Sequence, residues 1–375
     1  MSTFSSFIKN IKKGFTGKNK KPEKEIQSPK IAVALSSDVS KVPQKLDDVS
    51  LPVLRGKYAL AKWLGISASR LTWFTYETKY NSVWHYVRHI IPKRNGGERV
   101  ILAPKRELKA LQRRVLDGIL NQVPTSPQAH GFVMQRSITT NARPHVNKAV
   151  VINLDLKNFF PSVTLPRVLG IFRTLGYNKE VALALARLCT ECDREVGPHL
   201  DSKYKDKEFF VSVTPRHLVQ GAPTSPALSN LVCWKLDKRL NGLAQTYQFT
   251  YTRYADDLTF SGDDIQYVEL ILKVANGIVR DEGFKVNKDK THVFYPSSRQ
   301  VVTGLVVNDK VATPRQLRRQ MRAIIHNAQF TGLEAQNYEQ HPNFRYHLLG
   351  VAEFIGSTHP DKAEQMKQII HALPS

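Results

Sequence analysis

Residues 249–262 read FTYTRYADDLTFSG, and this stretch decides how the surrounding chain can be arranged. Aromatic and β-branched residues lie on both sides of Asp256 and Asp257, which predicts a strand, a tight turn and a second strand. The two aspartates fall at the turn. Because Asp is common in ordinary β-turns, the pair alone does not indicate a function.

A third aspartate lies on another predicted strand. Residues 149–156, AVVINLDL, are short and β-branched, and Asp155 stands near their end. Carboxylates crowded on rigid elements repel one another and raise each other's pKa, and divalent cations relieve that repulsion. Oxygen ligands suit Mg²⁺, and two such ions can activate an attacking hydroxyl and stabilise a leaving pyrophosphate.

The remaining elements surround these strands. We expect a β-hairpin in PKRNGGERVILAP (92–104), turning at residues 95–97, where glycine supplies a positive φ. We expect helices at about 164–190, 224–245 and 265–282, and strands in VNKDKTHVFY and QVVTGLVVN. From Thr313 onward the chain is predicted to be helical.

The composition indicates a polyanionic partner. The 375 residues include 55 Lys and Arg against 32 Asp and Glu, a net charge of +23, which favours nucleic acid. Hydrophobic residues make up 41%, enough for a real core and against global disorder. Three cysteines exclude a disulfide framework and suit a reducing cytoplasm. No apolar run is long enough to span a bilayer.

Two regions carry most of the basic character that could contact nucleic acid. The segment from His85 to Val115 holds nine Lys and Arg. In the helix after Thr313, four arginines are predicted to lie opposite the apolar face: Arg315, Arg318, Arg319 and Arg322. This face is either a solvated surface or, as we prefer, a surface laid along a phosphate backbone.

Residues 1–50 differ from the rest. Apolar residues at helical spacing in the first fifteen positions predict a basic helical extension, and a Lys-, Gly-, Pro- and Ser-rich linker follows. The helix is either a frayed tail or a docking element for a partner protein or RNA.

Five strings in order resemble the reverse transcriptases: PKRNGGERVILAP (92–104), LDLKNFF (154–160), QGAPTSP (220–226), YADD (254–257) and GFKVNKDKT (283–291). The resemblance covers most of residues 51–375. It implies an α+β right-hand polymerase fold with a helical N-terminal extension. The implied domains are an extension and linker at 1–50, N-terminal helices and fingers at 51–148, a palm at 149–312 with a fingers portion at about 164–215, and a helical thumb at 313–375.

Three shorter strings resemble the retron branch of that family: AHGF (129–132), NARPH (141–145) and VTG (302–304). Either of the last two alone is weak evidence. Asn141 could be a helix cap, His145 a core histidine, and VTG a bulged strand. Val219 departs from the proline that the family often has before the glutamine of QGAPTSP, and the 50-residue leader is a larger departure.

The resemblance also implies residue roles. Asp155 and Asp256 are expected to hold two Mg²⁺ ions, with Asp257 as a supporting ligand, and Lys290, near Lys288, to protonate the leaving pyrophosphate. The expected dNTP-binding residues are Lys93, Arg99, Gln220, Gly221 and Phe160, the last as a gate against ribose or, alternatively, a core residue. Expected RNA or duplex contacts are Asn141, His145, Val302, Thr303, Gly304, Arg315, Arg318, Arg319 and Arg322. Cys189, Cys192, His199 and Cys233 fit no zinc pattern.

The function implied is an RNA-directed DNA polymerase in the bacterial cytoplasm. A retron enzyme is expected to copy part of its cognate structured non-coding RNA (msr-msd type), primed from an internal guanosine 2′-OH, giving branched RNA–DNA (msDNA). It would use dNTPs and act in antiphage defence with a separate effector protein. The alternatives are another prokaryotic reverse transcriptase, diversity-generating or intron-like, and a non-catalytic RNA-binding scaffold.

Overall fold

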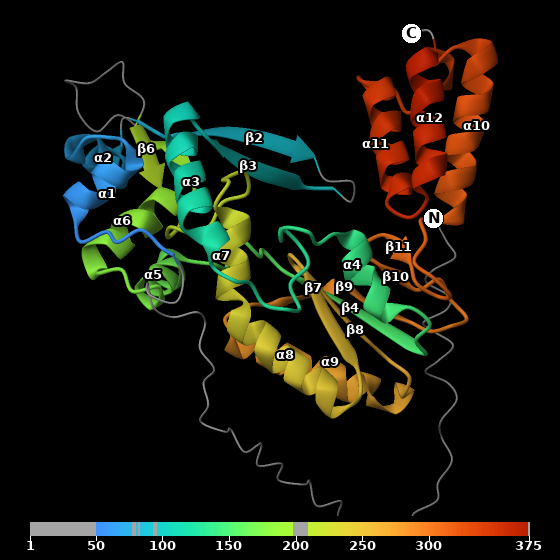
Figure 1. Ribbon diagram of the computed structural model, residues 1–375, viewed down its shortest axis with the longest axis horizontal. Coiled ribbons are helices and arrows are strands. Elements are labelled where there is room, and N and C mark those ends of the chain that lie inside the picture. The colour runs from blue at the N-terminus through green and yellow to red at the C-terminus, as the bar shows by residue number, and fades with distance from the viewer. Residues whose placement is uncertain (1–49, 77–79, 82, 93–95, 198–208, 374–375) are drawn as a thin grey trace, which may run out of the picture. The chain divides into compact units, whose positions relative to one another are not determined.

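The computed structural model describes residues 50–76, 80–81, 83–92, 96–197 and 209–373 (Figure 1). Four sequence-based expectations lie outside them: the N-terminal helix and linker, Lys93, His199 and part of the hairpin turn at 95–97. No helix in the described ranges is both long and apolar enough to cross a lipid bilayer.

A four-stranded antiparallel sheet carries the aspartates. Its strand order is β7 (Thr250–Tyr254), β8 (Asp257–Gly262), β4 (Val150–Leu156), β9 (Val286–Phe294). The hairpin predicted from residues 249–262 is therefore confirmed, and β4 confirms the strand predicted at 149–156. β4 is buried along almost its whole length, because both faces of the sheet are covered.

Helices α8 (Trp234–Thr246) and α9 (Val268–Asp281) cover one face of this sheet (Figure 1). Each of the first two predicted helices is in fact a pair of helices. The first pair is α5 (Leu165–Thr174) and α6 (Lys179–Cys189), and α7 (Ser225–Val232) precedes α8. Gly176 adopts a positive φ of 94°, which ends α5 and turns the chain.

The second region contains the basic hairpin. Its helices are α1 (Lys57–Leu64), α2 (Ala68–Thr75) and α3 (Arg106–Gly118). Strands β2 (Tyr86–Pro92) and β3 (Glu98–Pro104) pair antiparallel, as predicted. A three-stranded sheet has the order β1 (Tyr80–Asn81), β6 (Phe209–Ser212), β5 (Arg194–Gly197). One apolar core is shared by this region and the four-stranded sheet.

The other face of the four-stranded sheet is covered by α4 (Ile138–Ala142) and a small hairpin of β10 (Val301–Val302) and β11 (Leu305–Val306) (Figure 1). The turn of that hairpin is Thr303-Gly304, both with positive φ, at 47° and 82°. This is the geometry of a tight hairpin turn, for which glycine is favoured at the second position. The VTG string is thus a hairpin corner.

Three C-terminal helices follow: α10 (Arg315–Thr331), α11 (Phe344–Gly356) and α12 (Pro360–Ala372). They pack around an apolar cluster of their own that includes Met321, Leu348 and Ile370. Short 3₁₀ turns lie at Leu120–Gln122, Arg143–His145, Ile265–Tyr267 and Glu334–Gln336. The proposed domain boundaries remain predictions.

Candidate active site and nucleic-acid interface

The three aspartates lie together at one end of the four-stranded sheet. Asp155, next to the last residue of β4, stands directly opposite Asp257, the first residue of β8. Asp256 occupies the turn between β7 and β8, and its carbonyl oxygen accepts a hydrogen bond from the backbone N–H of Leu156, with an N–O distance of 2.9 Å. Strand pairing therefore fixes all three carboxylates relative to one another.

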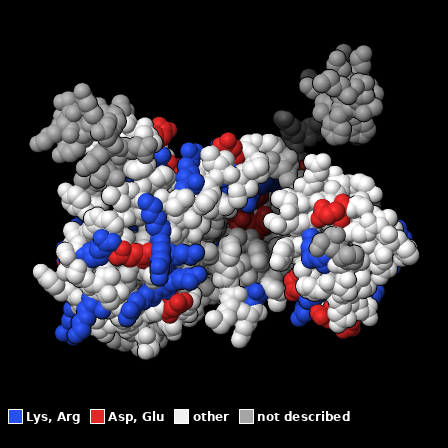
Figure 2. Space-filling model, turned by 90° about the horizontal axis from the view of Figure 1, so that it is seen from above, with Lys and Arg blue, Asp and Glu red and all other residues white. Residues whose placement is uncertain are grey.

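A cavity of about 840 Å³ contains this end of the sheet. Asp155 and Asp256 line it together with residues of β3, β9 and the loops around them. In Figure 2, acidic side chains lie within a hollow near the middle of the face, and Lys and Arg gather on the surface beside it. A positively charged surface beside an acidic, cation-binding site suits the approach of a polyanion.

The carboxylates are electrostatically strained. Burial and the neighbouring Asp155 raise the pKa of Asp256. Burial and the charges of Asp256 and Asp155 raise the pKa of Asp257 to about 7, although this residue keeps contact with solvent. Lys290 partly offsets the repulsion, because its ammonium donates to Asp155 Oδ1 at 2.8 Å, and this hydrogen bond raises the pKa of Lys290. The site therefore favours binding of a cation.

The donor set fits a hard cation that is shared with a substrate. No three His, Cys, Asp or Glu side chains in the described part of the chain are grouped as a complete metal cage. Mg²⁺ is typically held by one or two carboxylates and completes its shell with water and substrate phosphates. Asp155 and Asp256 can supply those carboxylates, and the Lys290 ammonium already shows that a cation is accommodated beside Asp155.

A buried ion pair supports the aspartate turn from one side of the sheet. The Arg253 guanidinium is fully buried and donates to both oxygens of Asp237, at 2.7 and 2.8 Å. It also donates to Asn230 and, at 3.1 Å, to the carbonyl oxygen of Ala255. Ala255 has a positive φ of 56° and directly precedes Asp256, so Arg253 stabilises the strained residue that aims the carboxylate.

A buried histidine supports the same hairpin from the opposite side, since adjacent residues of β7 point to opposite faces. His145 Nε2 lies 2.7 Å from Thr252 Oγ1 on β7, and His145 Nδ1 lies 2.7 Å from Ser261 Oγ on β8. Burial lowers the pKa of His145 to about 3, so the imidazole is neutral. A neutral ring offers one donor and one acceptor, which suits two hydroxyl partners.

Several predicted dNTP-binding residues line the cavity with the aspartates. Arg99 on β3, Phe160 and Gln220 all contribute to its wall. The ring of Phe160 is half-buried and lies 5.4 Å from that of Phe159, between centroids. Lys290, rather than Lys288, donates to Asp155, which separates the two lysines that the sequence could not distinguish.

Gly221 lies close to the backbone of β3. A Cβ atom at this position would lie 2.7 Å from the carbonyl oxygen of Leu102 on β3, and φ is 119°. The backbone N–H of Leu102 also donates to the carbonyl oxygen of Gln220. Glycine is therefore required here because β3 packs directly against this loop.

Phe132 lines the same cavity and was not predicted as a site residue. Its side chain is 53% exposed, its φ is 61°, and its ring lies 6.5 Å from Phe160 and 6.4 Å from Tyr254, between centroids. A large aromatic side chain exposed from a strained backbone position indicates a binding surface. Phe132 follows Gly131 in the AHGF string, and that string was the feature of the sequence from which this residue could have been predicted.

Three predicted RNA contacts are buried inside the protein. The side chains of Asn141, His145 and Val302 are fully buried, so they cannot contact RNA from the surface described. His145 is the core histidine of the alternative interpretation. Val302 belongs to an apolar cluster with Ala142 and Leu305, beside α4. In the VTG string, Gly304 is exposed and Thr303 is half-buried, donating to the carbonyl oxygen of Ile138.

The basic face of α10 is narrower than predicted. Arg318 is half-buried, and its guanidinium lies 3.2 Å from His359 Nε2, so it is not part of the exposed face. The exposed stripe has residues at spacings of three and four: Arg315, Arg319, Arg322, His326 and Phe330. We call these five residues the α10 stripe. His326 and Phe330 were not predicted, because only the arginines of this helix were considered as nucleic-acid contacts.

The Arg253–Asp237 pair predicts a large effect on stability. Replacing Arg253 with methionine leaves the Asp237 carboxylate buried without its partner, and breaking one side of such a pair costs about 3 to 5 kcal/mol. Urea unfolding of the purified protein measures this loss. Lys367→Met, which removes surface pairs with Glu353 and Glu364, should cost far less, because exposed ion pairs contribute little to stability. Equal losses for the two variants would contradict the assignment.

Known proteins match this chain over most of its length. A family model described as reverse transcriptase (RNA-dependent DNA polymerase) matches residues 91–346. Retron Mx65 reverse transcriptase of Myxococcus xanthus is 46% identical over 316 residues, 84% of this chain and 71% of that protein. Retron Ec86 reverse transcriptase of Escherichia coli is 36% identical over 284 residues, 76% of this chain and 81% of that protein.

Among solved structures, a telomerase from Candida albicans matches with a TM-score of 0.42 and 14% identity, over 76% of this chain and 62% of that one. Reverse transcriptases are RNA-directed DNA polymerases with the right-hand fold, and they generally use divalent metal ions. The aspartate cluster lies within the matched range. By family model and by relatives, this chain belongs to the reverse transcriptases and, within them, to the retron reverse transcriptases.

Proposed function

We propose that this polymerase copies part of a cognate structured RNA, starting from the 2′-hydroxyl of a guanosine within that RNA, and so makes branched msDNA. The observation that carries the proposal is the register of Asp155 opposite Asp257, with Asp256 in the turn between. The choice of a structured RNA as the template rests on the similarity to retron reverse transcriptases. We propose that the product acts in antiphage defence with a separate effector protein, in the reducing bacterial cytoplasm.

Asp155 and Asp256 would hold two Mg²⁺ ions, with Asp257 in support. When bound, these ions would supply Lewis-acid activation of the priming hydroxyl and charge stabilisation for the leaving pyrophosphate. Lys290 is placed to give a proton to that leaving group, since its ammonium is exposed in the cavity and lies beside the carboxylates. Its hydrogen bond to Asp155 holds it there in the absence of substrate.

We propose that the incoming dNTP occupies the cavity of about 840 Å³ that Asp155 and Asp256 line. Arg99 would bind the triphosphate by bidentate hydrogen bonds, joined by Lys93. Gln220 and Gly221 would border the new base pair. Phe160 would lie beneath the sugar, where its ring leaves no room for a 2′-hydroxyl.

The α10 stripe would follow the phosphate backbone of the growing RNA–DNA duplex. Three arginines at one-turn intervals neutralise phosphates without reading sequence. The ring of Phe330 is 77% exposed and lies 5.3 Å from that of His326, so the stripe ends in two rings that can pack on a sugar or base. Thr303 and Gly304 are the part of VTG that could contact RNA, since Val302 is buried.

Asp256→Asn is expected to abolish DNA synthesis while leaving RNA binding intact. The change removes a carboxylate charge but keeps its size. The assay incubates the protein with its own RNA, Mg²⁺ and dNTPs, and then treats the product with a debranching enzyme. A matched control is Asp263→Asn, on an exposed surface aspartate paired with Lys148. Near wild-type synthesis by Asp256→Asn would refute the metal assignment. A wild-type product that resists debranching would refute the priming proposal alone.

Phe160→Ala is expected to weaken discrimination against ribonucleotides. Opening space beneath the sugar should improve kcat/KM for an rNTP relative to the matching dNTP by about tenfold or more. Phe132→Ala, which removes a neighbouring ring from the same cavity, serves as the control and should change the two substrates alike. Unchanged selectivity in Phe160→Ala would return Phe160 to the role of a core residue.

Replacing single arginines of the α10 stripe should reduce the salt dependence of RNA–DNA duplex binding. Each lost phosphate contact lowers the slope of log K against log salt by about 1. The measurement is fluorescence anisotropy at several salt concentrations with Arg319→Gln and Arg322→Gln. Arg318→Gln should leave the slope unchanged, because this guanidinium points toward His359. An equal decrease for Arg318→Gln would show that the face is wrongly assigned.

A further inference from the structure

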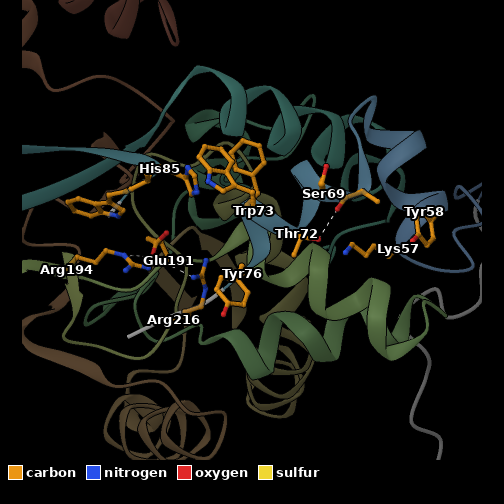
Figure 3. A pocket seen from close by; sticks show the side chains of 14 residues that line it. Lys57, Tyr58, Ser69, Thr72, Trp73, Tyr76, His85, Glu191, Arg194 and Arg216 are labelled. Carbon is orange, nitrogen blue, oxygen red and sulfur yellow. Dashed lines mark hydrogen bonds and ion pairs between the residues drawn. The ribbon is translucent and has the colours of Figure 1, made fainter. Parts of the chain in front are cut away.

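A second cavity, of about 830 Å³, lies between α1, α2 and the chain around β5 (Figure 3). None of the aspartates lines it. Its wall contains six aromatic or imidazole rings: Tyr58, Trp73, Phe74, Tyr76, Trp84 and His85. The volume lies within the range of cavities that bind small molecules and cofactors.

The charge of this cavity is positive. Lys57, Arg194 and Arg216 line it, and among the described residues Glu191 is the one acidic side chain in its wall. Glu191 is already engaged, because its carboxylate accepts from Arg194 at 3.1 Å and lies 3.8 Å from Arg216. Both guanidiniums are almost fully buried, so their positive charge is poorly screened by water. The cavity therefore favours an anionic group.

Three of the rings remain accessible. Tyr58 is 81% exposed, Tyr76 66% and Trp73 39%. The Trp73 ring is held in place: Arg70 lies 3.8 Å from its centroid, and His85 packs edge-on at 4.3 Å between centroids. An aromatic ring that is fixed and still reaches solvent loses little entropy on stacking, which favours a planar ligand.

The second cavity adjoins the catalytic one. Trp84 and Arg194 line both cavities, so these two side chains form part of a common wall. The indole N–H of Trp84 is buried and has no acceptor among the described residues. An unmatched donor in such a wall is costly, and a bound polar ligand that shifts the ring could satisfy it.

We propose that this second cavity binds an unpaired nucleotide of an RNA strand whose other part occupies the catalytic cleft. The base would stack on Trp73 or Tyr76, and its phosphate would lie toward Arg194 and Arg216, which are at the same end of the cavity as Tyr76 (Figure 3). Rings combined with cations that lie beside a polymerase cleft suit single-stranded nucleic acid, because every base has a face to stack and every nucleotide carries a charge. The strand is either template ahead of the primer terminus or RNA that is not being copied.

The test measures binding of two probes by anisotropy. One is an RNA template annealed to a DNA primer, with either a blunt end or a short unpaired RNA extension ahead of the primer. The other is oligo(U) alone. Tyr76→Ala should weaken binding through the cavity about fivefold or more, the loss of one base stack, and Tyr76→Phe should restore it. The matched control is Tyr346→Ala on α11, where the tyrosine is 75% exposed against 66% for Tyr76.

The pattern of losses identifies the strand. If the extension strengthens wild-type binding and Tyr76→Ala removes that gain, the cavity holds the template ahead of the primer. If only oligo(U) binding depends on Tyr76, it holds RNA that is not copied. If neither probe responds to Tyr76→Ala or to Trp73→Leu, the proposal is overturned. Affinity for the blunt duplex reports whether the catalytic cleft is intact in each variant.

Discussion

The structure depends on holding three mutually repelling carboxylates in one place. Antiparallel pairing of β4 with β8 sets Asp155 opposite Asp257, and the turn adds Asp256. Without a cation the arrangement is unfavourable, as the raised pKa values of Asp256 and Asp257 show. The fold must therefore resist the relaxation that this repulsion would cause. A rigid sheet with support on both faces provides that resistance.

The support comes from polar groups inside the protein. On one face Arg253 connects Asp237 to the carbonyl oxygen of Ala255, and on the other His145 joins β7 to β8. Apolar packing alone could not hold Ala255 at a positive φ, because packing is not directional, whereas a guanidinium hydrogen bond is. A close approach adds to this, since a Cβ at Gly131 would lie 2.6 Å from the backbone nitrogen of Ala255. The catalytic hairpin is thus positioned by buried directional contacts.

The sequence allowed the catalytic elements to be predicted but not their support. The aromatic and β-branched residues of 249–262 and the β-branched run at 149–156 predicted strands, because such side chains pack well on a pleated surface. The order of the motifs indicated the family. Nothing in a linear pattern shows that Arg253 and Asp237 pair, because the partners lie on different elements and a charged residue usually predicts surface. Helical projection placed Arg318 on the exposed face of α10, because it does not show that the neighbouring His359 draws this side chain inward.

Two of the three retron strings, NARPH and VTG, are best understood through packing. Ala142 of NARPH and Val302 of VTG belong to one apolar cluster, and Thr303 donates to the carbonyl oxygen of Ile138 at the start of α4, so the two strings pack against each other. The same cluster reaches the C-terminal helices, because Phe354 of α11 packs against it and Thr139 donates to the carbonyl oxygen of Ser357. A sequence motif can thus be typical of a family because it packs one structural element against another. Direct RNA contact by these strings is left to their exposed residues, which are Arg143 and Pro144 of NARPH and the hairpin corner at Thr303-Gly304.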